Sequence, residues 1–510
     1  MSGFDHPWAA LEFAAAEWPT EDALVFPHQG QGLSFSQWRK RAEDMAGRLS
    51  AAGIRGGQHV ALLAENRIEW PIVQMACAAM GAVFVPLNSH YRRDDLAYVL
   101  KQSNAVALIC SRGFRGNPYL ENVAALRGQL PDLRHVFCLD EDWVREAGSF
   151  DHVASKVAAL LYTSGTTGFP KGALLSHRAM MLDALGAAER LGLAAGDRWT
   201  SIIPLFHCAG CIMNILGCLQ RGATYVGVPS FDADTMFRVI QDERCTFLSG
   251  VPTSYLAMLD HPARKTYDLS SLKAGSCGGA DANPEILRRC AEEFPLRGLA
   301  QVYGQTEGAT LFACPQADDP LRFETVGKAL PGYELRIVSP DSLAAMPAGE
   351  IGEIQARGPM VMEGYYAMPE ATAETLLPGG WLRTGDLGYL NGDERLVIAG
   401  GRLRDMIIRG GENIYPAEIE NILAEHESIA GVAVFGMKDD YYGEIVAAAV
   451  QLRHAVSARE LAATCGGRIA KFKVPVVFFR VDAFPLTASG KVRKVELRDM
   501  ASKAALEVLA

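Results

Sequence analysis

The sequence predicts an α/β protein with a large N-terminal domain, made of two helix-covered sheets and a barrel-like subdomain, and a small α+β C-terminal domain. Its 510 residues exceed the size at which one hydrophobic core usually stops growing, so several cores are expected. Up to about residue 310, helical patterns alternate with short apolar runs. From residue 326 to 396 the pattern changes to short strands between Gly and Pro turns.

The alternating part predicts parallel sheets covered by helices. Two uncharged stretches, residues 71–88 and 202–219, approach the length of a membrane span, but Pro, Gly, Gln, His and Asn interrupt them. The first is better explained by a helix that ends at Gly81 and a strand over residues 82–86. The other short apolar runs expected to be strands are residues 60–63, 106–110, 224–228 and 246–248.

The last third of the chain predicts shorter elements. Strands over residues 333–338 and 352–357 fit an antiparallel or barrel-like segment. No internal repeat or low-complexity linker marks a domain junction, so its position depends on motifs. The compact α+β unit is expected to contain a helix begun by Pro416, strands near Val432 and Val446, a helix from about Ser457 and a strand from Val476.

Charge and cysteine usage exclude several classes of protein. A net charge of −10 argues against broad binding to nucleic acid or to an anionic membrane. No Lys or Arg precedes Arg39, so the cationic start of a signal peptide is missing and a cytoplasmic location is expected.

The 11 cysteines are scattered singly along the chain, as is typical of reduced thiols. Cys208 and Cys211 form a CxxC beside His207, but no second pair completes a metal site.

A glycine- and threonine-rich loop follows the apolar run over residues 157–161 and precedes residues 173–190, which are expected to be helical. Its glycines permit close approach of the backbone to phosphate, its hydroxyls donate hydrogen bonds, and a lysine supplies charge. The spacing does not match a Walker-type phosphate loop. The loop residues expected to bind ATP phosphates are Thr163, Ser164, Gly165, Thr166, Thr167, Gly168 and Lys171.

This loop resembles the signature of the adenylate-forming superfamily, which includes acyl-CoA synthetases, luciferases and the adenylation domains of peptide synthetases. Further segments similar to that family occur in the family's order. They are Pro204-Leu-Phe-His207, Gly278-Gly-Ala280, Tyr303-Gly-Gln-Thr-Glu307, Trp381-Leu-Arg-Thr-Gly-Asp386, Gly401-Arg-Leu-Arg-Asp405, Gly410-Gly-Glu-Asn-Ile-Tyr-Pro and Thr487-Ala-Ser-Gly-Lys491. The resemblance spans nearly the whole chain and implies acyl-adenylate chemistry with ATP and Mg²⁺.

For the nucleotide, the resemblance implies that Glu307 binds the Mg²⁺ bridging the ATP phosphates and that Thr306 donates to the α-phosphate. A carboxylate is the kind of ligand that Mg²⁺ prefers. Asp386 would accept the ribose hydroxyls, with Arg402 nearby. The residues that the resemblance places around adenine are Tyr303 and Gly304 with Gly278, Gly279 and Ala280.

The resemblance also implies a mobile C-terminal lid, which divides the chain into residues 1–404 and 405–510 with its hinge at Asp405. Lys491 would contact the carboxylate and the α-phosphate during adenylation, where a point charge offsets developing negative charge. Gly410 and Gly411 would line the thiol path once the lid rotates. His207 would position the carboxylate.

The acid is expected to be a monocarboxylate with an apolar tail. No Asp lies near His207 to hold an amino group, and Val302 replaces the arginine with which malonate-type relatives pair a second carboxylate. The expected pocket residues, small and neutral apart from His207, are His207, Cys208, Cys211, Gly275, Cys277 and Val302.

A fatty acid:coenzyme A ligase is therefore the main hypothesis. An aryl or alicyclic acid substrate, and transfer to a carrier protein in place of coenzyme A, stay open. A catalytically inactive nucleotide-binding regulator and a Walker-type ATPase are the alternatives outside this class. The sequence does not distinguish a monomer from a homodimer.

Overall fold

The computed structural model forms two compact units. Unit 1 comprises Met1–Gly278, Leu287–Glu334 and Ala356–Leu382, and unit 2 comprises Gly279–Ile286, Leu335–Gln355 and Arg383–Ala510. Within these bounds the structure describes residues 3–141, 148–163, 170–280, 282–340, 342–402, 405–409, 412–414, 416–439, 442–465, 468–469, 471–487 and 492–509.

Unit 1 contains a first seven-stranded sheet with the order β18-β8-β7-β4-β3-β5-β6. Strands β7, β4, β3, β5 and β6 are parallel, whereas β8 and β18 are added at one edge in antiparallel orientation. The strands are β3 (His59–Leu63), β4 (Val83–Pro86), β5 (Ala107–Cys110), β6 (His135–Cys138), β7 (Val157–Thr163), β8 (Lys171–Ser176) and β18 (Gly364–Tyr365).

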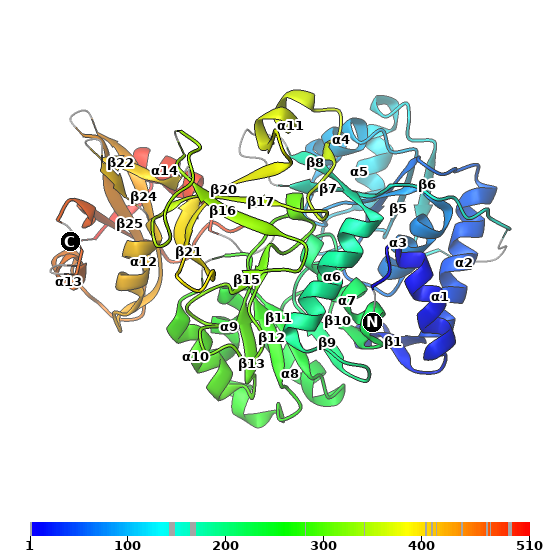
Figure 1. The fold of residues 1–510 in the computed structure, drawn as a ribbon, viewed down its shortest axis with the longest axis horizontal. Coiled ribbons are helices and arrows are strands. Elements are labelled where there is room, and N and C mark those ends of the chain that lie inside the picture. The colour runs from blue at the N-terminus through cyan, green and yellow to red at the C-terminus, as the bar shows by residue number, and fades with distance from the viewer. Residues whose placement is uncertain are drawn as a thin grey trace. The chain divides into compact units, whose positions relative to one another are not determined.

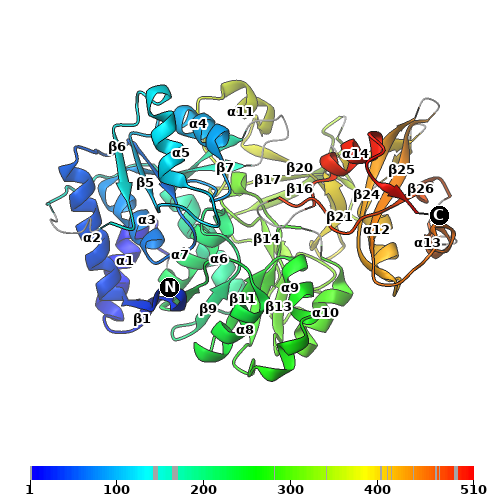
Figure 2. The same ribbon diagram turned by 180° about the vertical axis from the view of Figure 1, so that it is seen from behind.

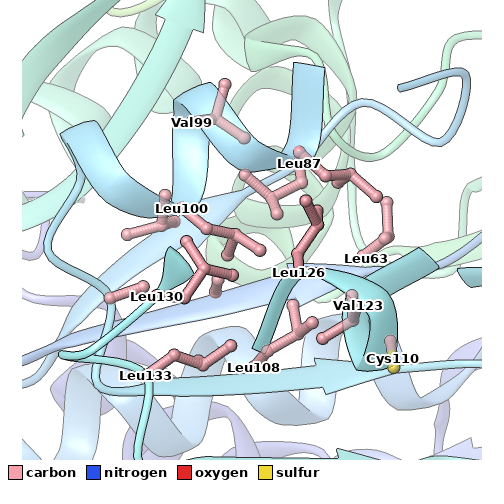
Figure 3. Packing of buried hydrophobic residues seen from close by; sticks show 14 of the residues in the cluster. Leu63, Leu87, Val99, Leu100, Leu108, Cys110, Val123, Leu126, Leu130 and Leu133 are labelled. Atoms are coloured by element: carbon pink, nitrogen blue, oxygen red, sulfur yellow. The ribbon is translucent and has the colours of Figure 1, made fainter. Parts of the chain in front are cut away.

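Helices α4 (Arg93–Gln102) and α5 (Tyr119–Leu126) cover one face of this sheet (Figures 1 and 2). Figure 3 shows Val99 and Leu100 of α4 and Leu126 of α5 packing with Leu108 of β5 in an apolar layer. Burial of such aliphatic side chains is the main favourable term in folding. Helices α1 (Pro7–Glu17), α2 (Phe35–Ala51) and α3 (Glu69–Met80) belong to the same unit.

A second seven-stranded sheet has the order β13-β12-β11-β9-β10-β1-β2 and is parallel except for the β1–β2 hairpin. Helices α8 (Ala233–Asp242), α9 (Pro252–Leu259) and α10 (Pro284–Glu293) lie beside it in both views (Figures 1 and 2). Its strands are β1 (Asp22–Phe26), β2 (Gln31–Ser34), β9 (Arg198–Ser201), β10 (Thr224–Gly227), β11 (Phe247–Gly250), β12 (Ala274–Cys277) and β13 (Gly298–Gln301).

Helix α6 (His177–Leu191) connects the two sheets, since it contacts β7 and β8 of the first and β12 of the second. It begins at an N-cap, Ser176, whose hydroxyl accepts a hydrogen bond from the Ala179 amide at 3.1 Å. The expectation of a helix over residues 173–190 is therefore wrong at its start. Residues 173–176 belong to β8, because pairing with β7 overrides the helix propensity of Ala and Leu.

Most of the predicted elements of unit 1 are confirmed. The stretch over residues 71–88 consists of the rest of α3, a left-handed Gly81 with φ +69° at the helix end, and β4. The stretch over residues 202–219 contains a π-helix (Ala209–Asn214) and part of α7 (Ile215–Arg221). Among the residues that the structure describes, no helix is long and apolar enough to cross a membrane. The remaining elements are β14 (Ala313–Cys314), β15 (Lys328–Ala329) and α11 (Pro369–Thr375).

The predicted antiparallel segment is a five-stranded sheet with the order β16-β17-β20-β19 and β21 paired to β20. The pairs β19–β20 and β20–β21 are antiparallel. The strands are β16 (Glu334–Val338), β17 (Gly352–Arg357), β19 (Leu376–Leu377), β20 (Trp381–Leu390) and β21 (Leu396–Arg402).

The C-terminal part of unit 2 is an α+β sandwich, as predicted. Its sheet buries Ile419 and Leu423 of α12 (Pro416–Ala424) and Leu461 of α13 (Ala458–Cys465) in one apolar cluster, and Leu497 of α14 (Lys494–Ser502) in another. The sheet has the order β23-β22-β25-β26-β27 with β24 on β25. Its strands are β22 (Ile407–Arg409), β23 (Glu412–Ile414), β24 (Ile429–Asp439), β25 (Gly443–Leu452), β26 (Val477–Arg480) and β27 (Glu507–Val508).

Candidate active site

The predicted phosphate loop connects two antiparallel strands of the first sheet. Thr163 ends β7, Lys171 begins β8, and the two residues are paired across the hairpin. The Thr163 hydroxyl donates a hydrogen bond of 3.4 Å to the Lys171 carbonyl oxygen. The hairpin register therefore fixes both ends of the loop. The predicted loop residues Ser164, Gly165, Thr166, Thr167 and Gly168 lie outside the described residues.

A tyrosine that the sequence did not single out joins the phosphate-loop lysine to the predicted magnesium ligand. Tyr365 lies on β18, paired with Ala173 of β8. Its hydroxyl donates to the Glu307 carboxylate at 2.7 Å, and the Lys171 ammonium lies 5.2 Å from the centroid of its ring. A cation at this distance from an aromatic ring is attracted by the ring quadrupole. One aromatic side chain thus contacts both predicted phosphate-site residues.

Glu307 is 8% exposed and lies in a single 3₁₀ turn, Thr306–Gly308. Its carbonyl oxygen accepts a hydrogen bond from the Met362 amide at 2.8 Å, which ties this turn to the segment leading into β18. A carboxylate suits Mg²⁺, which in nucleotide sites takes one or two carboxylates together with phosphates and waters. Within the described part of the chain no three His, Cys, Asp or Glu side chains group to hold a metal alone. Glu307 fits a metal that is held partly by ATP.

The segment around Glu307 is a narrow hairpin closed at Tyr303. The Tyr303 amide donates to the Ala313 carbonyl at 3.2 Å, and the Ala313 amide donates back at 3.2 Å. The two sides of the hairpin lie so close together that position 304 requires glycine, because a Cβ there would lie 2.0 Å from the Thr310 carbonyl oxygen. The half-buried Tyr303 ring lies 5.7 Å from the Phe312 ring.

A strained turn follows Glu307 directly. Ala309 has φ +56° and ψ −62°, a region that residues with a Cβ rarely adopt, and it is fully buried. The Thr310 amide donates to the Gly308 carbonyl at 2.6 Å across this turn. Such strain persists only where the surrounding structure imposes it, and it gathers at functional sites.

The predicted adenine-binding glycines follow the carboxyl end of β12. A Cβ on Gly278 would lie 2.7 Å from Cγ2 and 3.0 Å from the carbonyl oxygen of Val302, so the two residues approach closely. Gly279 has φ +80°, a conformation that favours glycine, and Ala280 follows it. Ligand sites in parallel sheets are found beyond the carboxyl ends of their strands, which is where Gly278 and Val302 lie.

His207 and Cys208 lie beside Thr306. The Thr306 hydroxyl is 3.7 Å from the Cys208 sulfur, and that sulfur is 3.6 Å from His207 Nδ1. The Ala209 amide donates to the same nitrogen at 3.3 Å, which orients the half-buried ring. The predicted acyl-positioning histidine and the predicted α-phosphate donor are therefore neighbours through Cys208.

The other predicted pocket residues are buried. Cys211 lies in the π-helix, and the buried Gln74 amide donates to its carbonyl oxygen at 3.0 Å. Burial raises the pKa of the Cys211 and Cys277 thiols, so both are neutral near pH 7. Gly275 lies inside β12, where a Cβ would lie 2.1 Å from the Leu248 carbonyl oxygen, and Val302 is 7% exposed.

Unit 2 contains the other predicted site residues. Asp386 lies on β20 opposite Arg402 of β21, and the Asp386 amide donates to the Thr384 hydroxyl at 3.1 Å. The segment just before Asp386 is held by the buried Glu353, whose carboxylate accepts a hydrogen bond from Arg383 Nε at 3.0 Å. Gly410, Gly411, Lys491 and the side chain of Arg402 lie outside the described residues, and half-buried Asp405 is described. An antiparallel bridge between Leu486 and Val492 bounds the segment containing Lys491.

The structure thus brings Lys171, Glu307, Thr306 and His207 together in unit 1, through contacts made by Tyr365 and Cys208. The pattern of AMP-binding enzymes matches residues 11–366, and that of their C-terminal domain matches residues 418–491. The chain belongs to the AMP-binding enzyme family. Membership in this adenylate-forming superfamily confirms the resemblance seen in the sequence.

Relatives of this AMP-binding enzyme are acid–CoA ligases. The chain is 37% identical to the putative acyl-CoA synthetase YngI of Bacillus subtilis, covering 96% of both chains. It is 34% identical to the mitochondrial medium-chain acyl-CoA ligase ACSF2 of Macaca fascicularis, covering 96% of this chain and 86% of the relative. A crystal structure of the anthranilate CoA ligase AuaEII with anthranoyl-AMP matches with a TM-score of 0.90 and 27% identity, over 99% of this chain and 98% of the other.

These findings establish the class of reaction. The protein is an AMP-forming acid–CoA ligase that uses ATP, Mg²⁺ and coenzyme A, and its α/β fold is that of adenylate-forming enzymes. Its substrates are a carboxylic acid, ATP and coenzyme A.

Proposed function

We propose that this ligase activates a monocarboxylic acid with an apolar tail, with a fatty acid as the preferred substrate class. The acid's carboxylate oxygen attacks the α-phosphorus of ATP, the bond to the leaving pyrophosphate breaks, and acyl-AMP forms. The coenzyme A thiol then attacks the acyl carbon, so that a thioester forms, AMP leaves and the thiol proton passes to solvent. Bringing these anions together requires charge neutralisation and alignment.

For the nucleotide, Lys171 supplies positive charge at the phosphates and Glu307 holds the metal, with Tyr365 fixing both side chains. The observation that carries this assignment is the 2.7 Å hydrogen bond from Tyr365 to Glu307 beneath the Lys171 ammonium. Bound Mg²⁺ would neutralise phosphate charge. Thr306 donates to the α-phosphate, and Tyr303 stacks on adenine beside Gly278.

The nucleotide roles are completed by residues that the sequence predicted. Asp386 accepts hydrogen bonds from the ribose hydroxyls. Arg402 is near this site because it is paired with Asp386 on the neighbouring strand, β21. The other phosphate- and adenine-binding residues are Thr163, Ser164, Gly165, Thr166, Thr167, Gly168, Gly279, Ala280 and Gly304.

For the acid, an apolar tail is supported by the uncharged, buried side chains of Cys208, Cys211, Cys277 and Val302. A second carboxylate buried among them without a cation would be costly. His207 orients the reacting carboxylate. Similarity to a medium-chain acyl-CoA ligase favours an aliphatic acid, and similarity to an anthranilate ligase makes an aryl acid the second candidate.

We further propose that residues 405–510 act as a lid that rotates about Asp405. Lys491 serves adenylation, and the segment with Gly410 and Gly411 serves thioester formation. The two half-reactions need different groups at one acyl carbon, and a conformational change meets this need. A cytoplasmic location stays a prediction, supported by 11 buried cysteines without disulfides.

A pyrophosphate-release screen tests the proposal. The purified protein is given ATP, Mg²⁺ and aliphatic acids of graded length, with benzoates, cinnamates and dicarboxylates alongside. We expect pyrophosphate with medium or long aliphatic acids, and loss of free coenzyme A thiol when that substrate is added. Preference for dicarboxylates would overturn the assignment of the acid.

Two further outcomes separate the alternatives. Acyl-AMP that accumulates with coenzyme A and is consumed only by a phosphopantetheine-bearing carrier protein would indicate loading of a carrier. ATP binding without pyrophosphate release from any acid would indicate a regulator.

A further inference from the structure

Asp183 is a buried acidic residue of helix α6. It is fully buried, and its sequence neighbours Met181 and Ala184 are buried as well. Its Oδ2 accepts a hydrogen bond from the Leu311 amide at 2.9 Å, whereas Oδ1 has no hydrogen-bond partner among the described residues. A carboxyl group placed in such a position needs an explanation, because burial of an unpaired charge is costly.

The Leu311 amide lies just beyond the strained turn that follows Glu307. That turn is held from one side by the Tyr333 hydroxyl, which donates to the Gly308 carbonyl at 3.0 Å. From the other side it is held by Asp183 through Leu311. The positive φ of Ala309 lies between these two contacts. The turn is therefore fixed at both ends by buried side chains.

The Asp183 carboxyl group holds the turn in its neutral form. Burial raises the pKa of Asp183 to about 8, although the hydrogen bond from the Leu311 amide acts in the opposite direction. The titratable groups that interact with it are Tyr333 and Cys314, and burial raises the pKa of both, that of Cys314 to about 12. Both neighbours are thus uncharged near pH 7, and the cluster is neutral.

We propose that Asp183 is a positioning residue for the nucleotide site: through the Leu311 main chain it fixes the turn that presents Thr306 and Glu307. This inference rests on the proposed roles of those two residues in binding ATP and Mg²⁺. Asp183 touches neither substrate nor metal. Its effect is transmitted by the backbone of residues 307–311, where a change of the turn would displace the Glu307 carboxylate.

Three variants test the proposal. Asp183→Ala removes the acceptor of the Leu311 amide, and Asp183→Asn keeps an acceptor oxygen in a side chain of the same shape. The control is Asp197→Ala, although Asp197, unlike Asp183, also forms an ion pair with Lys273 at 2.7 Å. Asp197 is also buried and accepts from a backbone amide, that of Ala194 at 2.9 Å, but it precedes β9 at the amino ends of the parallel strands, away from the site.

The first readout is hydrogen–deuterium exchange of residues 303–313 in the nucleotide-free protein. We expect exchange there to be about tenfold faster in Asp183→Ala, which corresponds to loss of roughly one hydrogen bond from a backbone amide to a side chain. Asp183→Asn and Asp197→Ala should exchange in this segment like the wild type.

The second readout is the Mg²⁺ and ATP dependence of pyrophosphate release with the best acid of the screen. We expect Asp183→Ala to raise the concentrations of both for half-maximal rate by about tenfold, and Asp183→Asn to restore them. Equal exchange and equal Mg²⁺ dependence in Asp183→Ala and Asp197→Ala would overturn the positioning role. A wild type that releases no pyrophosphate would overturn the proposed function, and the exchange readout would still decide on Asp183.

Discussion

The Tyr365 hydroxyl lies 2.7 Å from the Glu307 carboxylate, although the two residues belong to different elements, β18 and a 3₁₀ turn. The same ring lies beneath the Lys171 ammonium. One side chain thus contacts both the phosphate-loop lysine and the carboxylate that is proposed to bind the metal.

Tyr365→Phe removes that hydrogen bond while keeping the ring. A hydrogen bond to a charged group contributes about 1.5–3 kcal/mol, so we expect kcat/KM for acid-dependent pyrophosphate release to fall roughly ten- to a hundredfold. Tyr366→Phe is the control, because the Tyr366 hydroxyl accepts a hydrogen bond from the side-chain amide of the exposed Asn104. An equal effect of both substitutions would contradict the role of Tyr365.

Gly304→Ala tests the narrow hairpin around Glu307. The new Cβ would lie 2.0 Å from the Thr310 carbonyl oxygen, so the hairpin must widen. We expect about 1–3 kcal/mol of destabilisation and a lower melting temperature by calorimetry, together with a higher KM for ATP. Gly128→Ala, where nothing lies within 4 Å, should be near neutral. Unchanged melting and KM in Gly304→Ala would show that the hairpin is not constrained.

The stability of the protein should depend on pH through Asp183. The ordinary pKa of an aspartic acid is 3.8, and burial raises the pKa of Asp183 to about 8 in the folded state. Between these values the folded state keeps a proton that the unfolded state has lost, so the free energy of unfolding falls as pH rises. Urea denaturation should show wild type losing stability relative to Asp183→Asn from about pH 4 to pH 8. A difference that is constant over this range would place the carboxyl's pKa near its ordinary value.

Lys491→Ala should separate the two half-reactions. Because the lysine is proposed to act only in adenylation, we expect acyl-AMP formation to fall by about three orders of magnitude, the order found when a group stabilising transition-state charge is removed. Thioester formation from preformed acyl-AMP should fall little. Lys503→Ala, an exposed lysine of the same unit, serves as the control. Equal loss of both half-reactions would contradict the proposed lid.

Asp405→Pro restricts φ at the proposed hinge. We expect overall turnover to fall more than the better preserved half-reaction, because one arrangement of the lid would be trapped. Single-turnover measurements of each half-reaction beside steady-state turnover give the comparison. If all three rates match those of the wild type, rotation takes place elsewhere in the chain.

The fold was predictable where local pattern and tertiary context agree. The apolar run over residues 60–63 became β3, and residues 352–357, a short segment between Gly and Pro turns, became β17. Residues 173–176 were predicted wrongly because the partner that makes them a strand, β7, is recognisable only in three dimensions.

Candidate site residues could be proposed from the sequence where contiguous motifs contain them. Thr306 and Glu307 stand in one motif, whereas Tyr365 acquires its role from strand pairing with the distant β8 and has no local signal. Asp183 did have a signal, since it is a lone acid in an apolar helical run. Such a residue in a helix interior calls for a buried partner.

The π-helix that follows Cys208 has a consequence for the tolerance of this region to insertion and deletion. A π-turn holds one more residue than an α-turn, and each helical residue corresponds to a rotation of about 100°. Removing a single residue between Ala209 and Asn214 would let the chain return to α-helical winding and would turn His207 and Cys208 away from Thr306. We therefore expect the residue count of this segment to matter more to activity than the identity of any one of its side chains.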